Sequence, residues 1–461
     1  MKTEYFKNIV LREHIDTITD YHANGAYEKL KENITLKYKP SYAIMIRTLN
    51  FESNNFDSNL IYIDQNEYEY LSKSKVYSND IIMNKIANPG SVYIMPYLKQ
   101  PVSLAMNLFL IRFKCTLNQR FMYYLMKYNE SYIKQFANGT TTKTITKDSV
   151  RNLKFYVPEK QYQDKIANIL SSLDSKIEIN NRINKELEAM AKTLYDYWFV
   201  QFDFPDVNGK PYKSSGGKMV YNQELKREIP ERWEAKTIAQ FIGNNKGGDW
   251  GKEKEEGNYT QKVSCVRGAD LNGLNGLGSV NPPERFILEK NSNKILESHD
   301  LIVEISGGSP TQSTGRISFV IDETIKRFEN PLVCSNFCKS FSLENQKYLY
   351  YFIYMWNNLY DNRVLFGWEG KTSGIKNLLF DSLTQKYFII VPNENINLKF
   401  YEKMDSFHKM KQRNLKENQE LAKLRDWLLP MLMNGQVSVK DSEYKNSQND
   451  LLVAQPKPEY N

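Results

Sequence analysis

The sequence predicts an α+β protein with two similar globular domains, each followed by a long helix. The chain repeats itself, because the strand-like segment that ends at Pro158 recurs 234 residues later at Pro392. Each copy is followed by a long segment in which apolar residues alternate at steps of three and four, as in coiled coils. A segment rich in Pro, Gly and Ser separates the two copies and predicts an irregular connection. Because a whole domain separates the helices, we expect them to pair as an antiparallel coiled coil.

Other features recur in the same order in both copies, which is typical of internal duplication. The recurring segments are 80–83 and 300–303, 119–124 and 346–351, and 139–143 and 370–374, together with Arg47 and Arg267. The expected boundaries are 1–158 for the first domain, 159–202 for its helix, 203–232 for the linker, 233–395 for the second domain, 396–436 for its helix and 437–461 for a disordered tail.

Four asparagines lie on the apolar seams of the two helices: Asn180, Asn184, Asn414 and Asn418. Polar seam residues fix register at a cost in stability. We therefore expect these residues to set the register, and we expect leucine at both positions of the first helix to raise thermal stability.

The composition is that of a soluble globular protein, with 41% hydrophobic and 25% charged residues. No run of 18 apolar residues predicts a membrane span, and the first residues lack the apolar core of a secretion signal, so a cytoplasmic protein is expected. The net charge of +8 is uneven: residues 1–158 hold 21 Lys and Arg against 14 Asp and Glu, whereas residues 233–392 hold 18 of each. The first segment therefore fits a polyanionic partner better than the second.

No catalytic or metal-binding motif is complete. The segment 281–284 reads NPPE, where an adenine methyltransferase needs an aromatic fourth residue to stack on a flipped base. Gly370-Lys371-Thr372 lacks the first glycine of a phosphate-binding loop. Cys334 and Cys338 have no second ligand pair, so buried thiols are expected rather than a metal site.

Two loop regions offer hydroxyls, backbone N–H groups and cations that suit contacts to DNA. The alternative is that they are ordinary solvent-exposed loops. The candidate contacts are Arg47, Thr140, Thr141, Thr142, Lys143, Lys147, Arg267, Ser309, Gln312, Arg316, Lys371, Thr372, Ser373 and Lys376.

Aromatic and apolar residues gather at the ends of both helices. They either pack inside the fold or form a docking surface for another subunit. The candidates are Tyr195, Tyr197, Trp198, Phe199, Phe202, Trp427, Leu428 and Met431.

The segments YDYWFVQFDFPDVNGKPYKSSGGKM, EIPERWE and WLLPMLMNGQV resemble the central region and the second helix end of type I restriction-modification specificity subunits. The GTTTK and GKTSG loops resemble the stretch that closes each target recognition domain in that family. The N-terminus lacks a counterpart of the segment 229–233, so the start of the first domain is less well defined than that of the second.

The resemblance implies that each domain reads one half of a bipartite, asymmetric double-stranded DNA site. Two methyltransferase subunits with S-adenosylmethionine and two restriction subunits with ATP and Mg would supply the chemistry, and this chain would have no catalytic residue, cofactor or metal of its own. The alternatives are a self-contained methyltransferase or nuclease, and a coiled-coil scaffold that does not bind DNA.

Overall fold

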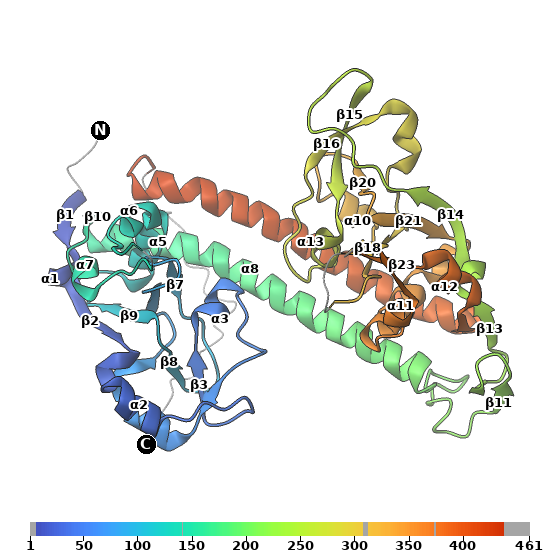
Figure 1. The fold of residues 1–461 in the computed structure, drawn as a ribbon, viewed down its shortest axis with the longest axis horizontal. Coiled ribbons are helices and arrows are strands. Elements are labelled where there is room, and N and C mark those ends of the chain that lie inside the picture. The colour runs from blue at the N-terminus through green and yellow to red at the C-terminus, as the bar shows by residue number, and fades with distance from the viewer. Residues whose placement is uncertain (1–5, 141, 308–311, 373–374, 438–461) are drawn as a thin grey trace, which may run out of the picture. The chain divides into compact units, whose positions relative to one another are not determined.

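The computed structural model describes residues 6–140, 142–307, 312–372 and 375–437, without side chains at 371 and 372 (Figure 1). The chain forms two compact units. The first contains the described residues up to Asp174 and those from Lys423 on, and the second contains Ser175–Ala422. Both units mix helices and strands, so the predicted α+β class is confirmed. None of the described helices is long and apolar enough to cross a membrane.

The first unit is built on two four-stranded sheets, of order β2-β9-β6-β7 and β4-β3-β8-β5, with β1 and β10 as a separate antiparallel pair. The strands are β1 (Phe6–Val10), β2 (Ile15–Asp20), β3 (Ala43–Ile46), β4 (Tyr62–Ile63), β5 (Lys75–Val76), β6 (Ile81–Asn84), β7 (Val92–Ile94), β8 (Val102–Leu104), β9 (Leu108–Phe113) and β10 (Lys154–Pro158). The helices are α1 (Leu11–His14), α2 (Tyr27–Asn33), α3 (Thr48–Glu52), α4 (Gln65–Tyr70), α5 (Gln119–Tyr128), α6 (Glu130–Lys134) and α7 (Lys147–Arg151). Strands β3 and β6 are buried along their whole length, which explains why they read as apolar runs rather than alternating patterns.

The second unit has a four-stranded sheet of order β14-β21-β17-β19, two three-stranded sheets of order β16-β15-β20 and β18-β23-β22, and the pairs β11-β12 and β13-β24. Its strands are β11 (Met219–Asn222), β12 (Arg227–Pro230), β13 (Glu234–Thr237), β14 (Ile242–Gly247), β15 (Tyr259–Val266), β16 (Glu284–Leu288), β17 (Leu301–Glu304), β18 (Ser306–Gly307), β19 (Ile317–Phe319), β20 (Leu332–Cys334), β21 (Cys338–Leu343), β22 (Glu369–Thr372), β23 (Ile375–Leu378) and β24 (Phe388–Val391). The short helices are α9 (Leu271–Leu274), α10 (Asp322–Ile325), α11 (Leu349–Asp361) and α12 (Phe380–Lys386).

The two units repeat one topology. The sheet β2-β9-β6-β7 corresponds to β14-β21-β17-β19, and the parallel pair β3 and β8 corresponds to β15 and β20. The antiparallel pair β1 and β10 corresponds to β13 and β24. The sequence repeat is therefore also a repeat of the fold.

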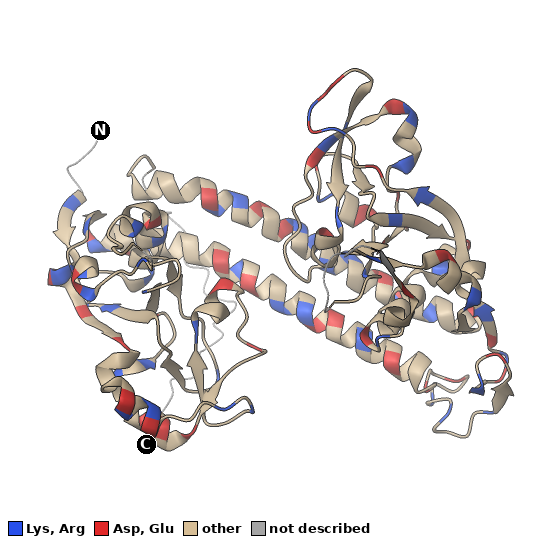
Figure 2. Cartoon of the chain, in the orientation of Figure 1, with Lys and Arg blue, Asp and Glu red and all other residues tan. Residues whose placement is uncertain are grey.

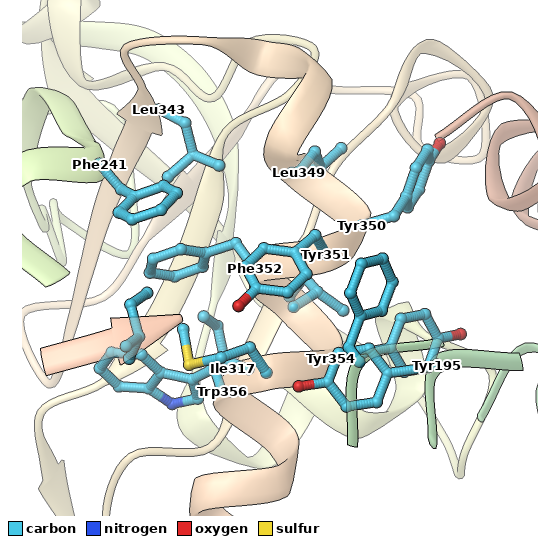
Figure 3. Packing of buried hydrophobic residues seen from close by; sticks show 14 of the residues in the cluster. Tyr195, Phe241, Ile317, Leu343, Leu349, Tyr350, Tyr351, Phe352, Tyr354 and Trp356 are labelled. Atoms are coloured by element: carbon cyan, nitrogen blue, oxygen red, sulfur yellow. The ribbon is translucent and has the colours of Figure 1, made fainter. Parts of the chain in front are cut away.

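The core of the second unit surrounds α11, where the run from Leu349 to Trp356 is buried on every side (Figure 3). A helix that is apolar all round belongs in a core. The same core takes in Phe204, which stacks on Trp233 at 4.9 Å between ring centroids. The interpretation of 203–232 as an irregular connection is therefore wrong in part: the segment holds the β11–β12 hairpin, and its Phe204 and Ile229 side chains are buried in this core.

Two long helices extend through both units: α8 (Lys160–Tyr195), which continues as a π-helical turn Asp196–Val200, and α13 (Glu394–Met433). In the second unit the amide Nδ2 of Asn180 donates to Asn418 Oδ1 at 2.9 Å, and Asn414 Nδ2 donates to Asn184 Oδ1 at 2.9 Å. Residue numbers rise along one helix as they fall along the other, so the contacting segments run antiparallel.

Candidate nucleic-acid interface

The candidate contact residues of the second unit gather at one end of its sheets. Strands β15, β17 and β20 end there, and β16, β19 and β21 begin there. Strand β18 pairs with β23, which pairs with β22. The structure thus joins the glycine-rich stretch near 306 to the GKTSG loop, two regions that the sequence left unconnected.

The first unit places its candidates at the corresponding end. Arg47 follows β3, and the Thr-rich loop is bridged to the segment after β6 through Thr144 and Ile86. The amide of Ile145 also donates to Lys85 O at 3.0 Å. Sequence reasoning missed this loop at 85–90, whose one signal is the turn sequence Asn-Pro-Gly.

The missed loop borders a cavity of about 470 Å³. Ala87 and Asn88 have φ values of 53° and 80°, a conformation that costs energy for alanine and often occurs at functional sites. Thr142 and Lys143 line the same cavity, and both are exposed, as is Thr140. These side chains can reach an anionic ligand without breaking an ion pair recorded for them in the described residues.

Arg47 and Arg267 occupy equivalent positions and anchor loops. Arg267 forms an ion pair with Asp270, with Nε to Oδ2 at 2.8 Å, and its Nη2 donates to Asn281 O at 3.0 Å. Arg47 Nη2 donates to Asn59 O at 2.7 Å. The hydrogen bond to Asp270 raises the pKa of Arg267. Base contacts by these guanidinium groups would compete with the bonds that hold the loops.

Arg316 and Lys376 are also held from within. Arg316 forms two hydrogen bonds with the buried carboxylate of Glu304, at 2.7 and 2.9 Å. Lys376 Nζ lies 3.3 Å from Glu369 Oε2 and 4.8 Å from the centre of the Phe366 ring. The charges of these two cations are thus neutralised by buried carboxylates.

Lys147 shares a carboxylate with Lys85, a residue that the sequence did not single out. Their Nζ atoms lie 2.7 and 3.2 Å from Asp20. Burial raises the pKa of Asp20, but the two lysines together lower this pKa by more, so the net shift is downward. Two cations against one acid leave this end of the first unit with a positive excess.

The remaining candidate DNA contacts lie outside the described residues or at the ends of described segments. Thr141, Ser309 and Ser373 lie outside the described residues. Lys371 and Thr372 form the end of β22, and Gln312 is exposed while its carbonyl accepts from Lys376 at 3.5 Å. The role of these residues in DNA contact stays a prediction.

The aromatic docking candidates divide by burial. Tyr195, Trp198, Phe199 and Phe202 lie in the core of the second unit, where Phe199 contacts Phe400 edge to face at 4.8 Å. Figure 3 shows Tyr195 in this core. Tyr197 is 37% exposed and Trp427 56% exposed, whereas Leu428 and Met431 are half-buried. The exposed rings remain available to a partner, and the buried ones stabilise the fold.

Two charged residues on the apolar seam of α13 have acidic partners on α8. Lys411 pairs with Glu188 in the second unit. In the first unit Arg425 Nη1 donates to Asp174 Oδ1 at 2.8 Å, and Tyr124 donates to the same carboxyl group. Residues of both signs lie along both helices (Figure 2).

The motif look-alikes have structural roles. The carbonyl of Asn281 accepts from Arg267, and Glu284 pairs with Lys262 at 2.8 Å. Burial raises the pKa of Cys334 and Cys338 to about 12. Among the residues that the structure describes, no three His, Cys, Asp or Glu side chains are grouped to hold a metal ion.

Comparison with known proteins agrees with these observations. Residues 23–189 match the family model of the type I restriction modification DNA specificity domain. The type I restriction enzyme MjaIX specificity subunit of Methanocaldococcus jannaschii is 27% identical over 70% of this chain and 69% of its own length. The HindI specificity subunit of Haemophilus influenzae is 39% identical over 23% of each chain.

A solved structure shares the fold. The crystal structure of a type I restriction-modification S subunit from M. genitalium aligns with a TM-score of 0.57 and 15% identity, covering 94% of this chain and 97% of the other. The chain is therefore similar to type I restriction-modification specificity subunits, and its residues 23–189 match the model of their DNA specificity domain.

Proposed function

We propose that this chain is the DNA sequence-recognition subunit of a type I restriction-modification complex. Each unit reads one half of a bipartite, asymmetric DNA site. The observation that carries this proposal is the duplicated frame: equivalent loops converge at the same end of each unit, yet they hold different side chains. Two equivalent frames with different contact residues suit two different half-sites.

The chain positions other subunits and does not catalyse a reaction itself. Two methyltransferase subunits bring S-adenosylmethionine, and two restriction subunits bring ATP and Mg. The incomplete NPPE and GKT motifs support this division, because Glu284 cannot stack on a flipped base as an aromatic residue would. The exposed rings of Tyr197 and Trp427 suit docking of the methyltransferase subunits.

Long-read methylation mapping tests the proposal in a host that expresses the full chain with its methyltransferase. The expected motif has two short defined stretches separated by an undefined gap. The variant Lys143→Ala is expected to lower the extent of methylation at the motif, because Lys143 would contact a phosphate and position the first unit on its half-site. Lys99→Ala is the matched control, because Lys99 is exposed at the opposite end of the same sheets.

Two results would contradict the proposal. One is methylation without a bipartite motif. The other is methylation of DNA by the purified chain alone with S-adenosylmethionine, which would make the chain an enzyme.

A further inference from the structure

A three-residue turn with equivalent backbone hydrogen bonds stands at the same place in both units, although its third residue has a positive φ in the first unit, at Asn107 (73°), and not in the second, at Phe337. It joins β8 to β9 in the first unit and β20 to β21 in the second. The first residue donates its amide to the neighbouring parallel strand, Ala105 to Ile46 O at 2.9 Å and Ser335 to Val266 O at 2.8 Å. Both turns lie at the end of the sheets where the candidate loops converge.

The third residue of each turn anchors the next loop. The carbonyl of Asn107 accepts from the amide of Lys85 at 2.8 Å, and the carbonyl of Phe337 accepts from that of Ile305 at 2.9 Å. In the second unit Gly248 also packs so closely that a Cβ there would lie 2.1 Å from Ser335 O. The backbone of the turn is therefore fixed on several sides.

The side chains on this fixed backbone point to solvent. Met106 is 45% exposed and Phe337 is 56% exposed, and Asn107 and Asn336 are exposed as well. Each turn thus presents one amide and one large apolar side chain, in opposite order. Within the described residues, neither of these amide side chains has a hydrogen bond recorded to another part of the chain.

A single exposed apolar residue is ordinary on a protein surface. The pairing of an apolar side chain with an amide, on equivalent rigid turns of both units, is not explained by packing. An A·T base pair presents the matching chemistry in the major groove, because adenine offers N6 and N7 to an amide and thymine offers a methyl group to an apolar side chain.

We infer that Met106–Asn107 and Asn336–Phe337 are specificity-determining pairs, one for each half-site. In each pair the asparagine hydrogen-bonds the edge of an adenine, and the apolar side chain packs against the methyl group of a thymine. The inference rests on the proposed function. The opposite order of the two side chains gives the two units different readings at equivalent places of the fold.

Binding of the assembled methyltransferase complex to duplexes that carry its mapped motif tests this inference. The variants are Asn336→Ala and Phe337→Ala in the full chain. Tyr221→Ala is the matched control, because Tyr221 is 58% exposed on the β11–β12 hairpin of the same unit. Uracil replaces single thymines to remove a methyl group, and 7-deazaadenine replaces single adenines to remove N7.

At the contacted base, the loss of affinity from the protein variant and the loss from the base analogue are expected not to add. Phe337→Ala lowers affinity about fourfold, as expected for one lost methyl contact, and uracil at the contacted position causes no further loss. Asn336→Ala lowers affinity about tenfold or more, and 7-deazaadenine at one position causes no further loss. The other half-site keeps its preference, and Tyr221→Ala binds like the wild type.

Failure of this inference and failure of the proposed function give different results. If both variants keep the melting temperature and the full base preference of the wild type, or weaken every sequence equally, the pair does not determine specificity. If the unaltered complex shows no preference for its motif, the proposed function fails instead.

Discussion

Buried carboxylates pair with some cations of the candidate interface and so limit their contacts with DNA. Glu304 is 6% exposed and holds Arg316 by two hydrogen bonds, which raise the pKa of the arginine. A carboxylate that loses such a partner stays buried without compensation, and this costs more than the pair contributes. Residues that resemble DNA contacts in the sequence can therefore be structural supports.

Removal of one partner of this pair is expected to be costly. Arg316→Met should lower the free energy of unfolding by about 3 kcal/mol, because Glu304 remains charged and unpaired. The double variant Arg316→Met with Glu304→Met should recover most of this loss. Urea denaturation of the wild type and these two variants measures the difference, and equal losses in the single and the double variant would contradict it.

Asp20 gives the first unit a pH dependence. Lys147 and Lys85 lower its folded pKa below the ordinary value of 3.8, against the effect of burial. Its contribution is therefore fully present above pH 3.8 and is lost as pH falls through the folded pKa. The difference in unfolding free energy between wild type and Asp20→Asn should be constant near neutrality and shrink below pH 4. A difference unchanged down to pH 2 would count against these ion pairs.

At the scale of elements, the helix seam corrects an expectation. The sequence predicted that leucine at 180 and 184 raises stability. The structure pairs these residues with Asn418 and Asn414, so replacing only Asn180 and Asn184 removes a hydrogen-bond partner from each of two half-buried amides on the other helix.

We therefore expect the double variant Asn180→Leu with Asn184→Leu to be less stable than the wild type. The fourfold variant, with leucine also at 414 and 418, should be more stable, because apolar side chains then replace all four amides of the seam. Thermal melting of the full chain measures both. A double variant that melts above the wild type would show that these hydrogen bonds add nothing.

Sequence patterns predicted the elements better than their contacts. Heptad spacing revealed α8 and α13 because one helix face is apolar. The same pattern does not reveal the acidic partners of Lys411 and Arg425 on the seam of α13, because Glu188 and Asp174 lie more than 200 residues away in the chain. The candidate loops were found by repetition, but which cations are already paired depends on tertiary contacts that no local pattern encodes.

At the scale of the whole molecule, the net charge differs between the two domain sequences. Residues 1–158 hold a net excess of Lys and Arg, and residues 233–392 hold none. In the described second unit Arg267, Arg316 and Lys376 all pair with acids. Counterion release should therefore favour the first domain as the source of salt-dependent affinity.

This difference predicts a salt response. Lys143→Gln in the first domain should reduce the slope of log affinity against log salt concentration by about one unit, because one phosphate contact is lost. Lys99→Gln removes the same charge at the opposite end of the sheets and should leave the slope unchanged. Titration of the assembled complex on its motif, at salt concentrations from low to physiological, measures both slopes. Equal slopes for both variants would mean that overall charge, and not the candidate interface, sets the electrostatic attraction to DNA.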